Sequence, residues 1–376
     1  MIPEAHLTFD WQGTIPPVEN RPAVFLIHMK SGAPYLARTT MLLRRMNRLL
    51  GAKAAGSRLL DLRNLTERVE VWYTPTRLEQ LLTFYAVARH HFPDNYKKTV
   101  RLPSPPYIKV LLNNPFPRTQ VSSRLSGKEN LFYGPFRNRA EAERWESEVL
   151  DFFQIRRCEE ELEPSLSHPG CIYGEMNQCM RPCQAIVGIT EYGTEVKRLK
   201  DFLETKGESL KEAIQHARDR ASSNMEFEEA ARQHRRFEKV EALLRLNSEI
   251  TGDIRFANGV SAVKAGSGVV LYFLLEGIWL APVSLDMAMQ AGESMDRRLR
   301  QLVEQLPKIS PTLKDREEHL ALLSRWFFST SRDSEWLPFA SVGELPYRKL
   351  VRMISRALNP PPAHANISVN EAQDPG

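Results

Sequence analysis

Four cysteines lie close together in the middle of this chain of 376 residues. They are Cys158, Cys171, Cys179 and Cys183, with 12, 7 and 3 residues between successive ones. Thiols scattered through hydrophobic cores would not gather in this way, and the absence of a recognisable secretory signal argues against a disulfide framework. Four thiolates can complete the tetrahedral shell of a zinc ion or hold a four-iron cluster.

The spacing of these cysteines does not decide between the two metals. Paired Cys-x-x-Cys knuckles, which are typical of zinc sites, are absent, and the looser spacing favours an iron–sulfur cluster. Four unrelated buried thiols are the alternative to a metal site. Three arginines flank the cluster, where they would offset thiolate charge or contact phosphate: Arg156, Arg157 and Arg181.

A helical hairpin is predicted after the cysteines, over about residues 195–250. Its second helix repeats apolar residues three or four positions apart between Phe227 and Leu244. The residues at 222–225, Ser-Ser-Asn-Met, break the helix and offer capping side chains. Such a hairpin is either purely structural or buries so little alone that it docks on a partner's hairpin.

The first hundred residues are predicted to form a small α/β domain. The apolar run at 24–29 suits a buried strand, and the short segment at 34–37 completes a hairpin before a leucine-rich helix. Another strand at 69–73 leads into a helix over 77–90, which ends before a proline. Residues 258–285 alternate in polarity around Gly-Ser-Gly and predict an antiparallel meander.

The predicted fold class is therefore α+β. Further helices are expected at about 293–306, 314–328 and 346–357. The expected organisation is the small α/β domain at 1–100, a linker and cysteine segment at 101–190, the hairpin at 195–250, an α+β region at 251–358 and a disordered tail at 359–376.

The amino-acid composition indicates what kind of partner and which compartment to expect. The formal net charge of +5 and the pI near 9.0 allow a polyanionic partner. The longest apolar stretch, from Val269 to Val283, is interrupted by Glu276 and Gly277, so no membrane span is expected. Without a signal sequence, a cytoplasmic location with reduced thiols is expected.

The cysteine segment and the hairpin together resemble the middle of the UvrC family, the excinuclease C subunit. The resemblance rests on RRC…PGCIYGEMNQCMRPC, on FLETKG and on SSNMEFEEAARQHRRFEKVEAL, in that order. The stretch 225–231 corresponds to the aromatic and Glu-Ala-Ala core of the UVR motif, and YGPF at 133–136 and PPYIKV at 105–110 also match. The resemblance covers about residues 20–250.

This resemblance implies roles for the matching residues. It implies a 4Fe-4S cluster on the four cysteines, with zinc as the alternative. It also implies binding of the damage-loading subunit UvrB through Phe227, Glu228 and Ala231. Nucleotide excision repair, within the SOS response, would be the process, and DNA and UvrB would be the partners.

The same resemblance makes the N-terminal domain a GIY-YIG nuclease domain, from which this sequence departs. The first tripeptide reads Ala-Val-Phe, so that Phe25 replaces a tyrosine. The second reads Tyr-Leu-Ala, which keeps Tyr35 but loses the glycine. Arg38 stands where a lysine is common, and Arg45 matches the family's helix arginine.

The position of the family's metal-binding glutamate falls on Phe84. The nearest acid, Glu79, lies five residues back and so points about 140° away on a helix. Without an oxygen ligand, Mg²⁺ or Mn²⁺ has no evident site for assisting hydrolysis. The basic residues of the domain then either grip phosphates without cutting or form a solvated helix face; the candidates for DNA binding are Arg38, Arg44, Arg48 and Lys53.

The region after residue 285 shows neither the RNase-H-like nuclease nor the helix-hairpin-helix module of full UvrC proteins, so the resemblance is to a truncated member. The aromatic segment at 325–339 suits core packing or stacking on bases. The predicted function is DNA and UvrB binding in excision repair, with Tyr35 and Arg45 as vestiges of catalysis. The alternatives are an active metal-dependent endonuclease and an adaptor outside repair.

Overall fold

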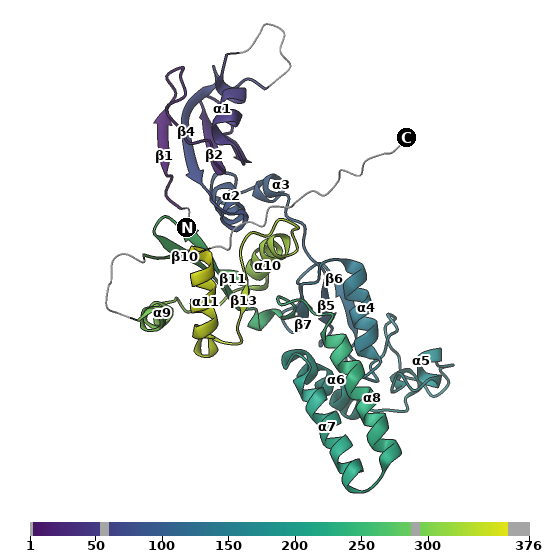
Figure 1. Ribbon diagram of the computed structural model, residues 1–376. Helices are drawn as coiled ribbons and strands as arrows, with labels where there is room; N and C mark the ends of the chain where they lie inside the picture. The colour runs from purple at the N-terminus through teal and green to yellow at the C-terminus, as the bar shows by residue number, and fades with distance from the viewer. Residues whose placement is uncertain (1–2, 53–59, 287–293, 360–376) are drawn as a thin grey trace, which may run out of the picture.

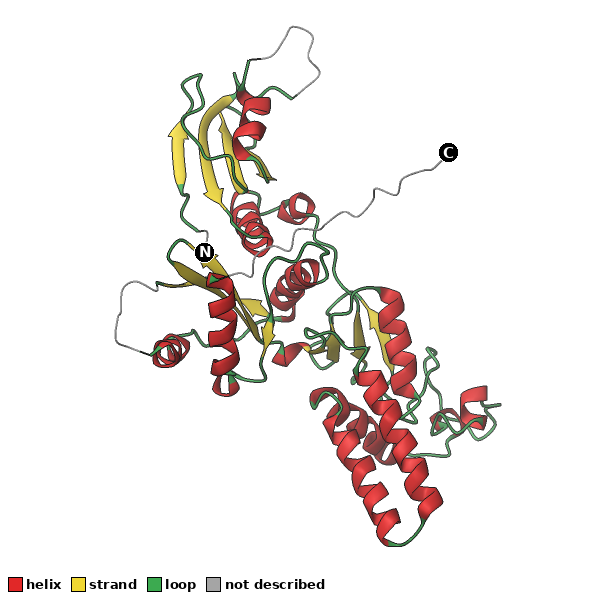
Figure 2. Ribbon diagram, in the orientation of Figure 1, coloured by secondary structure: helices red, strands yellow, loops and turns green. Residues whose placement is uncertain are grey.

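The computed structural model describes residues 3–52, 60–286 and 294–359. Its strands form three separate sheets, each accompanied by helices (Figures 1 and 2). Every strand pairing in these described ranges is antiparallel, so the predicted α+β class is confirmed. Lys53 and the predicted tail from residue 360 onward lie outside the described residues.

The sheet of the N-terminal unit has the strand order β1-β4-β2-β3. Phe25 and Ile27 pack in one core with helix α1, whereas Val24 and Leu26 pack in another core with helix α2. A strand covered on both faces needs apolar residues at successive positions, which explains the unbroken apolar run of β2. The elements are β1 (Leu7–Asp10), β2 (Ala23–Met29), β3 (Tyr35–Thr39), α1 (Leu42–Leu50), β4 (Thr66–Tyr73), α2 (Arg77–His91) and α3 (Tyr96–Val100).

The middle unit has a small sheet with the order β6-β5-β7-β8 and an associated group of helices. The region predicted as one hairpin at 195–250 contains the end of one helix before the hairpin proper, which occupies 208–244. The elements are β5 (Tyr107–Val110), β6 (Thr119–Ser122), β7 (Leu131–Gly134), α4 (Arg139–Leu150), α5 (Ile172–Glu175), α6 (Ile189–Glu204), α7 (Glu208–Ser223), α8 (Phe227–Leu244) and β8 (Gly252–Asp253).

The C-terminal unit contains the predicted meander and three helices. Strands β9, β10 and β12 pair as expected, and the short strand β13 joins the edge of β9. The elements are β9 (Gly259–Ala265), β10 (Gly268–Leu275), β11 (Ile278–Trp279), β12 (Val283–Leu285), α9 (Met295–Glu304), α10 (Leu313–Phe327), β13 (Leu337–Pro338) and α11 (Tyr347–Leu358).

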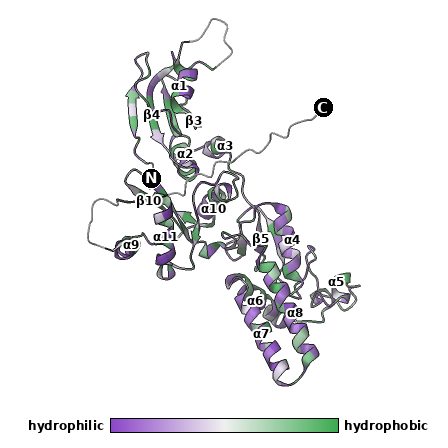
Figure 3. Ribbon diagram, in the orientation of Figure 1, coloured by the Kyte–Doolittle hydropathy of each residue, from purple (hydrophilic) through white to green (hydrophobic). Residues whose placement is uncertain are grey.

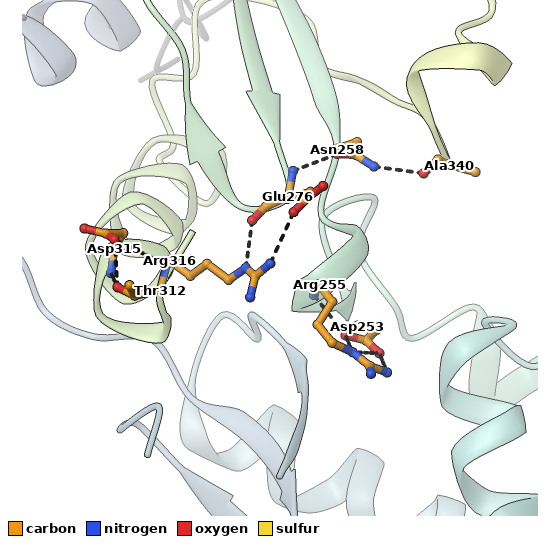
Figure 4. Close-up of polar contacts among 8 residues, drawn as sticks. All are labelled: Asp253, Arg255, Asn258, Glu276, Thr312, Asp315, Arg316 and Ala340. Atoms are coloured by element: carbon orange, nitrogen blue, oxygen red, sulfur yellow. Dashed lines mark hydrogen bonds and ion pairs between the residues drawn. The ribbon is translucent and has the colours of Figure 1, made fainter. Parts of the chain in front are cut away.

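Polar contacts tie the sheet of the C-terminal unit to α10 (Figure 4). Thr312 and Asp315 form a capping box that begins this helix. One turn later, the Arg316 Nε donates to the main-chain carbonyl of Glu276 at 2.9 Å. The main-chain N–H of Glu276 in turn donates to Asn258 Oδ1 at 2.8 Å. The turn between β10 and β11 is therefore fixed from both sides.

The N-terminal and C-terminal units meet where α2 and α3 lie beside α10 (Figure 1). Glu318 of α10 accepts hydrogen bonds from Tyr85 and Tyr96, each at 2.6 Å, and pairs with Lys97 at 3.0 Å. Burial alone would raise the pKa of Glu318, but these three partners lower it below its ordinary value. The two units thus share one satisfied polar network.

Among the residues that the structure describes, none of the helices combines the length and the apolar character that a membrane crossing requires.

Candidate functional site

The structure brings together Tyr35 and Arg45, the two residues predicted to be vestiges of catalysis. Tyr35 begins β3 and Arg45 lies on α1, and the guanidinium donates to the tyrosine hydroxyl at 2.8 Å. The ring of Phe25, in place of the first tyrosine, lies 6.3 Å from the ring of Tyr35. A positioned arginine of this kind can contact a phosphate, but metal-assisted hydrolysis also needs an oxygen ligand for the metal.

Phe84, where the sequence resemblance predicts the position of a metal-binding glutamate, is a core residue. Its side chain is 8% exposed and belongs to a hydrophobic cluster that also contains Trp326 of the C-terminal unit. The guanidinium carbon of Arg38 lies 5.6 Å from the centre of its ring. This position therefore contributes to packing between two units and offers no oxygen atom to a metal.

Glu79 faces the C-terminal unit and lines a different site. It borders a cavity of about 680 Å³ between α2 and the C-terminal unit, together with Tyr272, Trp279 and His319. Burial raises the pKa of its carboxyl group to about 7, although a hydrogen bond with Tyr272 opposes the shift. The helical argument that Glu79 cannot replace a carboxylate at Phe84 agrees with this placement.

The basic residues predicted to bind DNA have different surroundings. Arg44 and Arg48 are exposed and lie one turn apart on α1. Arg38 is also exposed, but partial desolvation and the nearby Arg325 and Arg77 lower its pKa. This second group of arginines could not be recognised in the sequence, because its members come from β3, α2 and α10.

The aromatic segment at 325–339 lies mainly in the core. Trp326 and Trp336 are 2% and 7% exposed and pack edge to face. Arg325 donates to the main-chain carbonyls of Val100 and Arg101, both at 3.0 Å. Of the two alternatives weighed for this segment, core packing is therefore the one observed for the tryptophans.

The four cysteines occupy one neighbourhood between α4 and α6. Cys179 and Cys183 are buried, Cys158 is half-buried and Cys171, at the start of α5, is exposed. Burial raises the pKa of the Cys179 thiol to about 11, and the thiols of the other three add to the shift. Burial and the same neighbours, Cys158 and Cys171, raise the pKa of Cys183. The sulfur atoms thus lie within electrostatic reach of one another.

Arg156 holds the chain around the cysteines. It is 1% exposed, and its guanidinium donates to the carbonyls of Phe116, Cys158 and Glu160 at 2.9, 3.1 and 2.9 Å. Its main-chain N–H donates to the hydroxyl of Tyr192 at 2.9 Å. Because Arg156 is enclosed, contact with phosphate is the one of its two proposed roles that the structure does not allow, and its hydrogen bonds hold the main chain beside Cys158.

The other flanking arginines are also engaged locally. Arg157 pairs with Asp151 at 2.7 Å and lies over the ring of Tyr173. Arg181 crosses Gly174, where an added Cβ would lie 2.7 Å from the Arg181 Cγ. The close crossing explains why a glycine stands inside α5.

The donor set of this segment suits a thiophilic metal. The segment supplies four thiols, and the main-chain N–H of Arg181 donates to Cys179 Sγ at 3.4 Å, as outer-shell donors do for bound thiolates. As the side chains stand, no group of three or more His, Cys, Asp or Glu residues in the described ranges already has the arrangement of a metal site. The residue types fit zinc or an iron–sulfur cluster.

The tip of the helical hairpin carries exposed apolar side chains. Met225 and Phe227 are 76% and 70% exposed, and Glu228 and Ala231 lie on the exposed side of the same turns. These residues line a shallow groove of about 840 Å³. The apolar residues on the inner side of the hairpin are buried instead; they are Leu210, Ile214, Ala221, Val240 and Leu243.

Comparisons with known proteins identify the class of the middle unit. Residues 105–202 match the family described as UvrC/Cho excinuclease, middle domain. This range runs from the start of the second sheet through the cysteines and most of α6. No solved structure matches the chain.

Curated relatives extend the match. The chain is 30% identical to UvrABC system protein C of Methylococcus capsulatus over 167 residues, which are 44% of this chain and 27% of that protein. It is 27% identical to the protein of the same name from Hydrogenovibrio crunogenus over 244 residues, which are 64% of this chain and 39% of that protein. For the Rickettsia bellii protein, the identity is 29% over 170 residues, or 45% and 26% of the two chains.

The aligned parts thus span between 26% and 39% of the length of these relatives. Residues 105–202 are thus similar to the middle domain of UvrC/Cho excinucleases, and about half of the chain is similar to proteins named UvrABC system protein C.

Proposed function

We propose that this protein binds DNA and docks on a UvrB-type damage-loading subunit in nucleotide excision repair without itself cutting the phosphodiester backbone. The observation that carries the proposal is the burial of Phe84 where a nuclease of this family would hold its metal. Glu79, the nearest acid on the same helix, is directed to a separate cavity and is hydrogen-bonded to Tyr272. Hydrolysis assisted by a metal would lack its ligand.

The exposed tip of the hairpin supports docking on the partner. Phe227 is the type of anchor that dominates helix-in-groove interfaces, because it can lose a large apolar surface to water on binding. The charged neighbours Glu228 and Glu229 would supply a polar rim. Phe227→Ala should weaken binding of purified UvrB by about 30-fold, as expected for a central anchor.

The matched control for this substitution is Phe256→Ala, since Phe256 is 53% exposed but lies outside the hairpin. Calorimetry on both variants, with circular dichroism as a check on folding, tests the hairpin as the docking site. Equal affinities for the two variants would remove the hairpin from the proposal.

The pairing of Tyr35 with Arg45 favours one alternative, a residual endonuclease that takes its metal ligand from elsewhere. That enzyme would nick damaged duplex in Mg²⁺ or Mn²⁺ with UvrB loaded, and Arg45→Ala would abolish the nicking. Intact duplex under these conditions is the result expected here.

The cysteine segment is proposed to hold a 4Fe-4S cluster, with zinc as the alternative. Its ligands would be Cys158, Cys171, Cys179 and Cys183. Bound metal would hold the segment between α4 and α6 in one conformation. The electrostatic coupling of the four thiols supports this assignment.

A further inference from the structure

The last described helix, α11, has an unusual balance of charge. It contains four cations, Arg348, Lys349, Arg352 and Arg356, and no acidic residue. Its own charge of +4 is close to the formal net charge of +5 of the whole chain. Alternation of hydrophilic and hydrophobic residues along its turns is visible in Figure 3.

The apolar side of α11 anchors the helix rigidly. Leu350, Met353 and Ile354 are buried in the core of the C-terminal unit and pack on β9 and β10. The cations therefore lie on the opposite, solvent-facing side, where Arg348, Lys349 and Arg352 are exposed. A helix held in this way presents its charges at fixed spacings.

Intramolecular stability does not explain these cations. Positive side chains in the first turn oppose the helix dipole, and α11 begins with Arg348 and Lys349 and no acid. Every other helix of ten or more residues in the described ranges has an acid in its first turn: Glu79, Glu141, Glu191, Glu208, Glu228 and Glu229, Asp296 and Asp315. In α11 the first turn departs from this preference and gains no compensating stability, which indicates that its cations serve a function.

The cations border an open groove of about 870 Å³ between α9 and α11. Asp296 is the one acid of its lining, and it is neutralised by Arg300 at 2.9 Å. Arg300 also stacks on Tyr347, 4.2 Å from the ring centre. In the described part of the chain, Arg348, Lys349 and Arg352 make no side-chain hydrogen bond or ion pair. The groove is thus strongly positive.

We propose that this groove and the outer side of α11 form a second DNA-contact surface, which binds the phosphate backbone. Arg348, Arg352 and Arg356 follow one another at intervals of four residues, or about 6 Å along the helix, a spacing that lets each reach a different phosphate of one strand. Because Arg356 already pairs with Glu335, most of the proposed phosphate binding comes from the other cations. The choice of DNA as the polyanion rests on the proposed function; the site is new and lies in a different unit from α1.

The test uses a triple variant that neutralises the unpaired cations, Arg348→Gln with Lys349→Gln and Arg352→Gln. A control variant removes the same charge from exposed arginines that pair within their own helices: Arg139→Gln with Arg144→Gln and Arg245→Gln. Anisotropy of a fluorescent duplex is measured for the full chain at several salt concentrations. Each lost phosphate contact should lower the salt slope by about 0.9, so the triple variant should lose about 2.7 and the control almost nothing.

Further arms of the experiment separate the possible failures. If the α1 variant Arg44→Gln with Arg48→Gln weakens binding while the α11 variant matches wild type, the second surface is refuted and the proposed function stands. If wild-type protein binds no duplex even at low salt, both fail. If polyglutamate displaces the duplex as effectively per charge as unlabelled DNA does, the surface fits an acidic protein and the assignment to DNA is overturned.

Discussion

The nuclease-like face of the N-terminal unit and the cysteine segment of the middle unit use their chemistry-bearing positions in opposite ways. On the nuclease-like face, Phe84 is packed into a core shared with the C-terminal unit. In the cysteine segment, four thiols share one neighbourhood, and the buried Arg156 anchors the chain through carbonyl groups around them. The first region uses its position for packing and offers no oxygen atom there, whereas the second keeps four thiol groups.

The family match follows the same division. It begins at residue 105 and ends at residue 202, so it includes all four cysteines and none of the nuclease-like face. A family match over one region therefore does not assign the family's function to the other regions of the chain. The function of each region depends on which of its polar atoms are available to bind a ligand or a metal.

The largest expected effect tests the cysteine side of this comparison. Cys179→Ser should abolish bound metal, because a hydroxyl is a poor replacement for a buried thiolate ligand. Iron, zinc and sulfide analysis of anaerobically purified protein would measure the loss, with a visible spectrum for the cluster. Ser165→Ala, in the same segment, is the control and should keep full metal content. Wild-type protein without iron or zinc would show that the four thiols do not act as ligands.

A second prediction tests the nuclease-like face of the N-terminal unit. Phe84→Glu restores the carboxylate of the family's metal site, but it places a charge in a core and should destabilise the protein by about 3–5 kcal/mol. Phe84→Leu should cost only about 1–2 kcal/mol. Urea unfolding measures both, and neither variant should nick duplex in Mg²⁺. A Phe84→Glu protein as stable as Phe84→Leu, with Mg²⁺ binding, would mean that this position is still an open metal site.

Sequence patterns were most informative where local physics decides structure. The apolar run of β2 and the helical repeat of α2 predicted their elements to within a residue or two, because burial on known faces sets both patterns. The edge strand β1 and the helix α6 were missed. The first is four residues long and pairs with a single strand among the described residues, and the second, Ile189–Glu204, has Gly188 as its N-cap and therefore no side-chain cap.

The candidate sites depended on contacts that a sequence does not display. The clustering of the cysteines was visible in their spacing, whereas the burial of Arg156 was not. From the sequence, Glu318 would be placed on the surface of α10. In the structure its carboxylate accepts a hydrogen bond from Tyr85, which lies 233 positions away in the chain. Such long-range pairs decide whether a charged side chain is structural or available to a ligand, and no local pattern encodes them.

The smallest effect concerns Glu79, the acid nearest to Phe84 on α2. Its pKa rises from 4.5 to about 7 on folding because the carboxyl group is buried. Between these values the folded state holds a proton that the unfolded state has lost, so this residue's contribution to stability falls as pH rises from about 4.5 to 7. Glu79→Gln removes that penalty and should stabilise the protein by up to about 3 kcal/mol at pH 8, with no gain at pH 4.

The measurement must separate Glu79 from His319, which lines the same cavity and whose pKa burial lowers to about 4. A histidine that is kept neutral in the fold loses stability as pH falls through its range, so its slope opposes that of Glu79. The difference in unfolding free energy between variant and wild type cancels the histidine and isolates the carboxyl group. If that difference is independent of pH, the carboxyl group of Glu79 titrates as if in water, and α2 does not bury it against the C-terminal unit.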